Sequence, residues 1–168
     1  MTDKEKTAEI LRRINLMTAG NVADNFIKIN EFRLGSGYDG FSEKRMDCFA
    51  ISPNAGNKTI CYEIKVSRGD FKKDIKKEDK QIPARCFSNE FYYCTPKGLL
   101  SKEEVPVWAG LIEFDLEKPV ENGYYTDVKA TIIKNSPRFD KCLPTWGMVV
   151  SAYRNGFAER GKYVSDNN

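Results

Sequence analysis

Two acidic residues and one lysine in the middle of the chain have the types and spacing for metal-assisted hydrolysis. Asp47 lies in the segment RMDCFAIS, and Glu63 and Lys65 lie in TICYEIKVS. Both segments are rich in β-branched and aromatic residues, so we expect two strands that the turn-rich PNAGNK joins into a hairpin. Alternate residues of a strand share one face, which places Glu63 and Lys65 side by side.

The register of this hairpin decides whether Asp47 joins them. A loop covering residues 53–57 has a permitted length and would place Asp47 directly opposite Glu63. A slip of one residue would move Asp47 to the other face. In the first register the two carboxylates have Cβ atoms about 5 Å apart, which is repulsive unless a cation lies between them.

A divalent cation is the natural partner of such a pair. Two carboxylates, the backbone carbonyl of Ile64 and waters form an all-oxygen ligand set, which suits Mg²⁺ or Mn²⁺ better than zinc. Such an ion can hold a phosphate and supply a hydroxide nucleophile. Lys65 would stabilise the developing negative charge or position the attacking water. The alternative is a solvated charged face without function, because Glu-x-Lys pairs are common on exposed strands.

The composition excludes several other chemistries. The chain contains no histidine, which removes Ser-His-Asp and Cys-His catalysis and His-ligated zinc. A net charge of +3 permits a nucleic-acid partner without establishing one. The five cysteines form no CxxC pair and are expected to be small buried residues rather than a disulfide framework.

Length and hydropathy predict a single domain without a membrane-spanning segment. The 168 residues are typical of a single domain, here residues 1–168. Neither a signal sequence nor a membrane span is expected, because MTDKEK opens the chain and no apolar run approaches about 18 residues. We therefore expect a cytoplasmic protein.

The segments before the hairpin predict a helix and a strand. Thr2 and Glu5 have capping-box spacing, and apolar residues then recur on one helical face, so we expect a helix over 3–18. Residues 25–34 form an imperfect strand pattern, and the glycine-rich GSGYDGFSEKR that follows is expected to be a loop.

The segments after the hairpin complete an α/β order. We expect a short lysine-rich helix over 70–81 that ends before Pro83, then strands EFYYCTP, AGLIEF and 124–134. A last helix is expected after Thr145. Its apolar residues, predicted to face a core, are Trp146, Val149, Val150, Tyr153 and Phe157. This order predicts one mixed central β-sheet flanked by helices.

These motifs resemble the PD-(D/E)XK nuclease superfamily, through RMD, EIK and VSRGDF with a lysine-rich helix after them. More narrowly, the chain between Glu31 and Phe114 is similar to MmcB-like DNA-repair nucleases of bacteria and phages, through GSGY, RMDCFAIS, CYEIKVSRGDFKKD, FYYCTPKGLL and VPVWAGLIEF. The resemblance implies a restriction-endonuclease-like α/β fold in a single domain. It also implies a Mg²⁺- or Mn²⁺-dependent DNA nuclease of DNA repair, recombination or phage DNA metabolism. Met46 replaces the proline of the superfamily signature.

The resemblance assigns roles to individual residues. Asp47 and Glu63 match the metal ligands, and Lys65 matches the catalytic lysine. The superfamily often adds an acid from its first helix, for which Glu9 is the candidate and Glu31 the rival.

Other residues could assist the site or have a purely structural role. Arg68 and Lys72 could contact DNA phosphates or only make the helix soluble. Gln81 could be a polar group of the site or a solvated helix end. Residues 91–93 could stack on bases, although a core position is typical of strand aromatics, and the same packing role is expected of Trp108 and Trp146.

Two alternatives to a nuclease stay open at this point. One is a catalytically inactive nuclease-fold protein that binds nucleic acid or acts as an accessory or inhibitor protein. The other is an interaction domain with an incidental charged strand. The expected partner is DNA, with no membrane contact and with a homodimer as one allowed assembly, in the cytoplasm, or in the host cytoplasm for a phage-encoded chain.

Overall fold

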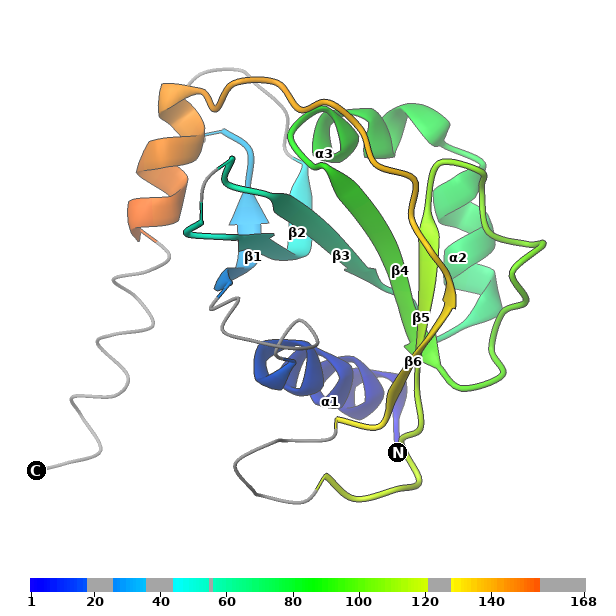
Figure 1. Cartoon of the computed structure of the whole chain (residues 1–168). Coiled ribbons are helices and arrows are strands. Elements are labelled where there is room, and N and C mark those ends of the chain that lie inside the picture. The colour runs from blue at the N-terminus through cyan, green and yellow to red at the C-terminus, as the bar shows by residue number, and fades with distance from the viewer. Residues whose placement is uncertain (18–25, 36–43, 55, 121–127, 155–168) are drawn as a thin grey trace, which may run out of the picture.

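The chain forms a six-stranded mixed sheet with helices on both faces (Figure 1). In this computed structural model the described residues are 1–17, 26–35, 44–54, 56–120 and 128–154. The strands are β1 (Ile27–Arg33), β2 (Arg45–Ile51), β3 (Thr59–Ile64), β4 (Glu90–Pro96), β5 (Gly110–Phe114) and β6 (Ala130–Lys134), and they lie in this order across the sheet. The predicted strands are thereby confirmed, with residues 25 and 124–127 outside the described residues. Most of the predicted glycine-rich loop, residues 36–43, also lies outside them.

Strand directions explain the mixed sheet. β1, β2 and β3 form an antiparallel meander, β4 and β5 run parallel to β3, and β6 returns antiparallel to β5. A parallel neighbour needs a crossover, and the helical segment after β3 supplies it. The expectation of an α/β fold with a mixed central sheet flanked by helices is therefore confirmed.

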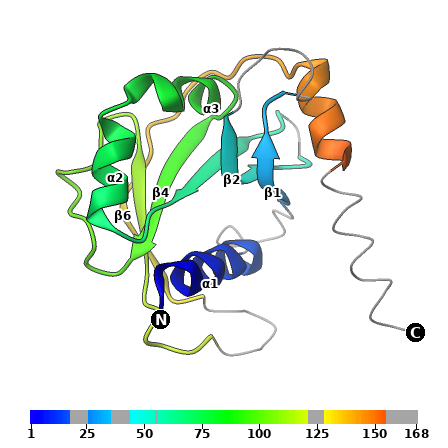
Figure 2. The same cartoon turned by 180° about the vertical axis from the view of Figure 1, so that it is seen from behind.

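Helix α1 (Asp3–Leu16) covers one face of the sheet (Figures 1 and 2). Its capping box forms as expected, since Glu5 N–H donates to Thr2 Oγ1 at 3.3 Å and Thr2 N–H donates to Glu5 Oε2 at 2.6 Å. Ile10 and Ile14 are fully buried against the sheet. The buried sheet residues of this first core are Cys48, Ala50, Ile60, Tyr62, Ile64, Tyr92, Cys94, Ile112 and Phe114.

The opposite face holds a second, aromatic core. Phe91 and Tyr93 of β4 pack edge-on at 5.3 Å, and Trp108 joins Phe91 at 5.3 Å. These strand aromatics are buried, so their expected packing role is confirmed. Cys48, Cys61 and Cys94 are buried as expected, whereas Cys86 is half-buried and Cys142 exposed.

The crossover is three short helical pieces rather than one helix over 70–81. Helix α2 (Arg68–Ile75) is followed by η1 (Glu78–Gln81) and α3 (Ile82–Cys86). The predicted stop before Pro83 is wrong, because Pro83 lies in the first turn of α3, where no backbone N–H is needed. The N-cap of α2 is Ser67, whose Oγ accepts from Asp70 N–H at 3.2 Å.

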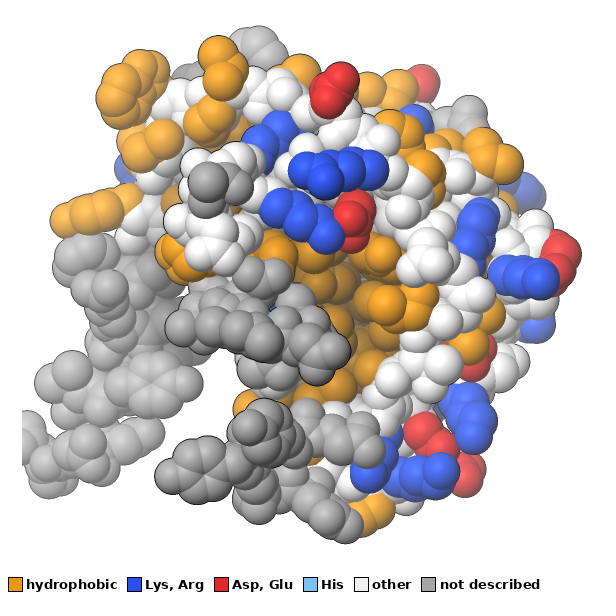
Figure 3. Space-filling view, viewed as in Figure 1, with side chains coloured by type: hydrophobic (Ala, Val, Ile, Leu, Met, Phe, Trp, Pro, Cys, Tyr) orange, Lys and Arg blue, Asp and Glu red, His pale blue; other side chains and the backbone are white. Residues whose placement is uncertain are grey.

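The C-terminal helix faces the opposite way from the prediction. Thr145 caps it as expected, accepting from Met148 N–H at 3.2 Å, and the helix covers residues 146–154. Its packed side is Met148 and Ser151, while Trp146 is 85% exposed. Figure 3 shows hydrophobic side chains over this helix at the upper left. The exposed apolar residues are Leu143, Trp146, Val149, Val150 and Tyr153, and Phe157 lies outside the described residues.

Among the residues that the structure describes, none of the helices has the length and apolar character needed to cross a bilayer.

Candidate functional site

The β2–β3 hairpin brings Asp47 and Glu63 together at the end of its paired region. The ladder runs from Ile51↔Thr59 to Cys48↔Tyr62, which is the predicted register. Pairing stops there, and Asp47 Oδ2 accepts a 2.7 Å hydrogen bond from the backbone N–H of Ile64. The carboxylate of Asp47 is thus fixed by the strand that carries Glu63.

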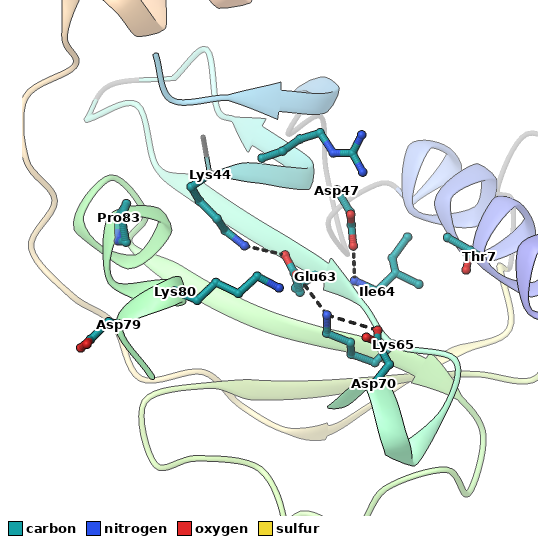
Figure 4. A pocket seen from close by; sticks show the side chains of 11 residues that line it. Thr7, Lys44, Asp47, Glu63, Ile64, Lys65, Asp70, Asp79, Lys80 and Pro83 are labelled. Atoms are coloured by element: carbon teal, nitrogen blue, oxygen red, sulfur yellow. Dashed lines mark hydrogen bonds and ion pairs between the residues drawn. The ribbon is translucent and has the colours of Figure 1, made fainter. Parts of the chain in front are cut away.

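Two lysines hold the carboxylate of Glu63. Lys65 Nζ donates to Glu63 Oε1 at 3.1 Å and Lys44 Nζ donates to Glu63 Oε2 at 3.2 Å (Figure 4). All three side chains are about 5% exposed. Because a buried charge is costly unless it is paired, these contacts are what makes the burial of Glu63 tolerable.

These groups line an open cavity of ≈ 690 Å³. Figure 4 shows Asp47, Glu63, Lys65 and Lys44 directed toward the same space. Four acidic and four basic side chains line the cavity, so its formal charge is balanced. The lining residues are Thr7, Lys44, Arg45, Asp47, Glu63, Ile64, Lys65, Asp70, Asp79, Lys80 and Pro83.

A buried aspartate of α2 supports Lys65 from behind. Asp74 is 2% exposed, and its Oδ1 lies 3.5 Å from Lys65 Nζ and 2.7 Å from Lys80 Nζ. Its Oδ2 accepts from Gln81 Nε2 at 2.6 Å and from Tyr93 O–H at 3.1 Å. Asp74 is not among the predicted site residues, and the signal for it in the sequence is its position three residues after Phe71, on one helical face.

The electrostatics of the site follow from burial and these neighbours. Burial, together with the nearby Glu63 charge, raises the pKa of Asp47 to about 6. Burial opposes the charged form of Lys65, but Glu63, Asp74 and Asp70 outweigh it and raise the pKa of its ammonium. Lys65 therefore carries its charge at neutral pH.

Desolvation also acts on Asp74, and here too the neighbours decide the outcome. Burial would raise the pKa of Asp74, yet the hydrogen bond from Lys80, the charge of Lys65 and the bond from Gln81 lower it overall. Asp74 is thus a charged anchor between Lys65 and Lys80. Burial and the nearby Asp74 raise the pKa of Tyr93, which keeps its O–H as a donor.

The other predicted site residues lie away from these groups. Glu9 is bound through both carboxylate oxygens by Arg12 and Arg13, at 2.7 to 2.8 Å. Its rival Glu31 pairs with Arg45 on the surface. Neither acid lines the cavity.

The predicted DNA contacts lie on the exposed side of α2, and Gln81 lies inside. Arg68 forms an ion pair with Glu104, and Lys72 is exposed. Gln81 is 1% exposed and bonds to Asp74, so it is neither a solvated helix end nor a member of the cavity lining.

The donor set of the cavity fits a hard divalent cation. Asp47, Glu63 and the carbonyl of Ile64 offer only oxygen, which Mg²⁺ and Mn²⁺ prefer. Within the described ranges, no group of three or more Asp, Glu or Cys side chains is arranged to hold a metal ion, so waters or substrate would have to complete the coordination. Lysine ammonium groups contact both carboxylate oxygens of Glu63, so at least one of these contacts must open before Glu63 can bind a metal ion.

Comparison with known proteins supports the fold alone. Neither a protein-family model nor a curated protein matches the chain. A solved structure described as the SPO1766 protein of unknown function from Silicibacter pomeroyi is similar, with a TM-score of 0.57 and 17% sequence identity. The alignment covers 99% of this chain and 93% of that chain. The chain therefore shares its overall architecture with that protein over nearly its whole length.

Proposed function

We propose that this protein is a metal-dependent DNA nuclease of the PD-(D/E)XK type that hydrolyses phosphodiester bonds. The observation that carries the proposal is the convergence of Asp47, Glu63 and Lys65 on one polar cavity. This arrangement combines two oxygen ligands from neighbouring strands with a charged amine. The narrower MmcB-like assignment, and a role in DNA repair, recombination or phage DNA metabolism in the cytoplasm, belong to the same proposal.

Asp47, Glu63 and the backbone carbonyl of Ile64 would hold Mg²⁺ or Mn²⁺. When bound, such an ion supplies Lewis acidity toward water and phosphate. Asp47 is positioned for this role by the Ile64 N–H, which occupies one of its oxygens. Glu63 is oriented by Lys65 at 3.1 Å.

Lys65 acts as a fixed positive charge in this proposal. Its raised pKa supports stabilisation of the negative charge that develops on the phosphate, rather than removal of a proton from water. Asp70 and Asp74, each 3.5 Å from its Nζ, hold the ammonium in place. Asp74 is therefore a positioning residue.

Charge balance explains why the cavity would need a cation to receive DNA. Four acids and four bases line it, which leaves no excess positive charge for a phosphate. A divalent ion would make the lining net positive. Arg68 and Lys72 would contact the DNA backbone farther out on α2.

The test is cleavage of plasmid, linear and branched DNA with Mg²⁺ or Mn²⁺. We expect Glu63→Ala and Lys65→Ala each to lower the rate at least about 100-fold, in line with the loss of a ligand or a charge-stabilising group. Glu90→Ala is the matched control, because Glu90 pairs with Lys58 at the start of β4 and neither residue lines the cavity. Unchanged cleavage in both site variants would overturn the mechanism.

A second candidate is a catalytically inactive nuclease-fold protein that binds nucleic acid or inhibits another protein. The observation that favours it is the pairing of both Glu63 oxygens with lysines. Thermal unfolding distinguishes the two, since a ligand that binds the native state must raise stability. No shift of the melting temperature in millimolar Mn²⁺ or Mg²⁺, combined with salt-sensitive DNA binding, would support this second candidate.

A further inference from the structure

Lys44 is a buried cation that is not among the predicted site residues. It directly precedes β2 and is 8% exposed. Lysine is seldom buried unless it is paired, and Glu63 Oε2 lies 3.2 Å from its Nζ. Its own backbone carbonyl accepts from Leu34 N–H at 3.3 Å, which fixes this end of the β1–β2 pair. The ammonium is thus held inside the cavity from an anchored backbone.

Lys44 and Lys65 contact different oxygens of the Glu63 carboxylate. Lys65 has two further acidic neighbours, Asp70 and Asp74, that hold its ammonium from the side of α2. Lys44 reaches Glu63 from the opposite side, at the oxygen that Lys65 leaves open (Figure 4). A second cation that approaches Glu63 therefore meets Lys44 at Oε2, where displacement leaves the anchoring of Lys65 intact.

We propose that Lys44 is a tethered counter-ion for the Asp47–Glu63 pair, which a divalent metal must displace from Glu63 in order to bind. This inference rests on the proposed function, because it concerns the same metal centre. In the metal-free protein the ammonium pairs with Oε2 of Glu63, the buried carboxylate oxygen that Lys65 does not contact. When the metal arrives, the two cations repel each other and compete for the same oxygen.

Two consequences follow from this competition. The metal-free protein gains stability from Lys44, and its affinity for metal is lowered by the same contact. The displaced side chain stays tethered to the cavity wall, where its ammonium can contact an anionic phosphate. Metal binding and phosphate binding would then support each other through one lysine.

The first test is Mn²⁺ titration of thermal stability in Lys44→Met, which removes the charge and keeps most of the length of the side chain. We expect the Mn²⁺ concentration that gives half of the maximal stabilisation to fall at least about tenfold. Coulomb's law gives this size for removal of a unit charge about 5 Å from a divalent ion in a water-like medium. Without metal, the variant should melt at a lower temperature than the wild type.

Lys58→Met is the matched control, because Lys58 also pairs with a glutamate, Glu90, but at the other end of the hairpin. It should leave the Mn²⁺ midpoint unchanged. An unchanged midpoint in Lys44→Met, with the Mn²⁺ response lost in Glu63→Ala, would overturn the role of Lys44 while the metal centre stands. If neither wild type nor Lys44→Met responds to Mn²⁺, the metal centre and this inference both fail.

A second test uses the wild type and does not depend on folding of a variant. Acetic anhydride labels accessible lysines, and mass spectrometry reads each site. We expect labelling of Lys44 to rise at least threefold in saturating Mn²⁺, while labelling of Lys58 stays constant. Equal labelling of Lys44 with and without Mn²⁺, in protein that Mn²⁺ stabilises, would show that the metal does not displace this amine.

Discussion

The backbone N–H of Ile64 donates a 2.7 Å hydrogen bond to Oδ2 of Asp47, in the place where a continued β2–β3 ladder would bring the carbonyl of Met46. The side chain of Asp47 thereby ends the pairing of the two strands. The same bond holds one carboxylate next to another, because Glu63 precedes Ile64. The metal-free site therefore contains an electrostatic cost that substitutions can relieve.

Asp47→Asn should stabilise the metal-free protein at pH 8. The folded-state pKa of Asp47 is raised from 3.8 to about 6 by burial and by Glu63, so ionisation opposes folding. The penalty is absent below about pH 4, grows as pH rises toward 6, and is fully present above it. Since one pKa unit corresponds to about 1.4 kcal/mol, we expect a gain of about 1 to 3 kcal/mol at pH 8 and almost none at pH 4.

Urea unfolding in EDTA at the two pH values measures this difference. The amide oxygen of asparagine can still accept from Ile64 N–H, so the fold is retained. Asp140→Asn, at an exposed position, is the control and should change stability by less than about 0.5 kcal/mol at either pH. Equal effects of Asp47→Asn at pH 4 and pH 8 would contradict the assigned electrostatic cost.

Asp74→Ala should destabilise the protein by about 3 kcal/mol or more. The change leaves the buried donors of Gln81 and Tyr93 without their acceptor and removes one of the three acidic neighbours of Lys65. Loss of one partner of a buried ion pair typically costs 3–5 kcal/mol. Tyr93→Phe removes a single hydrogen bond of 3.1 Å and should cost about 1 kcal/mol. Denaturant unfolding at pH 7 measures the loss of stability in each variant. Equal losses in Asp74→Ala and Tyr93→Phe would contradict the central position of Asp74.

The placement of Asp47 and Glu63 was predictable because it depends on local rules. Strand alternation fixes which residues share a face, and the length of the turn fixes the register of the hairpin. Both hold between β2 and β3, where Cys48 pairs with Tyr62 as expected. The sequence does not show that strand pairing stops after Cys48 and Tyr62. It stops because the Ile64 N–H donates to the side chain of Asp47 instead of to a backbone carbonyl of β2.

The partners of Lys44 and Asp74 depend on tertiary packing, which the local pattern does not encode, although the spacing from Phe71 indicates which side of α2 carries Asp74. Asp74 lies among lysines, and its helix has the sequence of a solvent-exposed helix. Only the packing of α2 against the sheet brings Asp74 to Tyr93 of β4. In the sequence Lys44 belongs to the glycine-rich GSGYDGFSEKR, which is expected to be a surface loop, yet it is buried against Glu63. The predicted orientation of the helix 146–154 is wrong for a similar reason. Its buried residues are Met148 and Ser151, while Trp146 faces solvent.

The two tryptophans should respond very differently to truncation. Trp108 is 8% exposed, packs edge-on against Phe91 at 5.3 Å and lies under the guanidinium of Arg85 at 4.3 Å. Trp108→Ala should therefore cost about 3 to 5 kcal/mol. Trp146 is 85% exposed, so Trp146→Ala should change stability by less than about 0.5 kcal/mol. Chemical denaturation measures both, and a large loss for Trp146→Ala would show that its face of the helix is covered.

Gly110→Ala should be among the most destabilising small substitutions, whereas Gly69→Ala should be tolerated. A Cβ at Gly110 would overlap the ring of Tyr92 and lie 2.6 Å from the backbone nitrogen of Ser136, so β5 or its neighbours must shift. Overpacking of this kind typically costs about 1 to 3 kcal/mol, and the backbone contact favours the upper end. At Gly69, in the first turn of α2, an added Cβ meets no atom within 4 Å, and alanine should stabilise the helix by about 0.5 kcal/mol. Thermal unfolding of the two variants tests the close approach at β5, since a Gly110→Ala protein as stable as Gly69→Ala would contradict it.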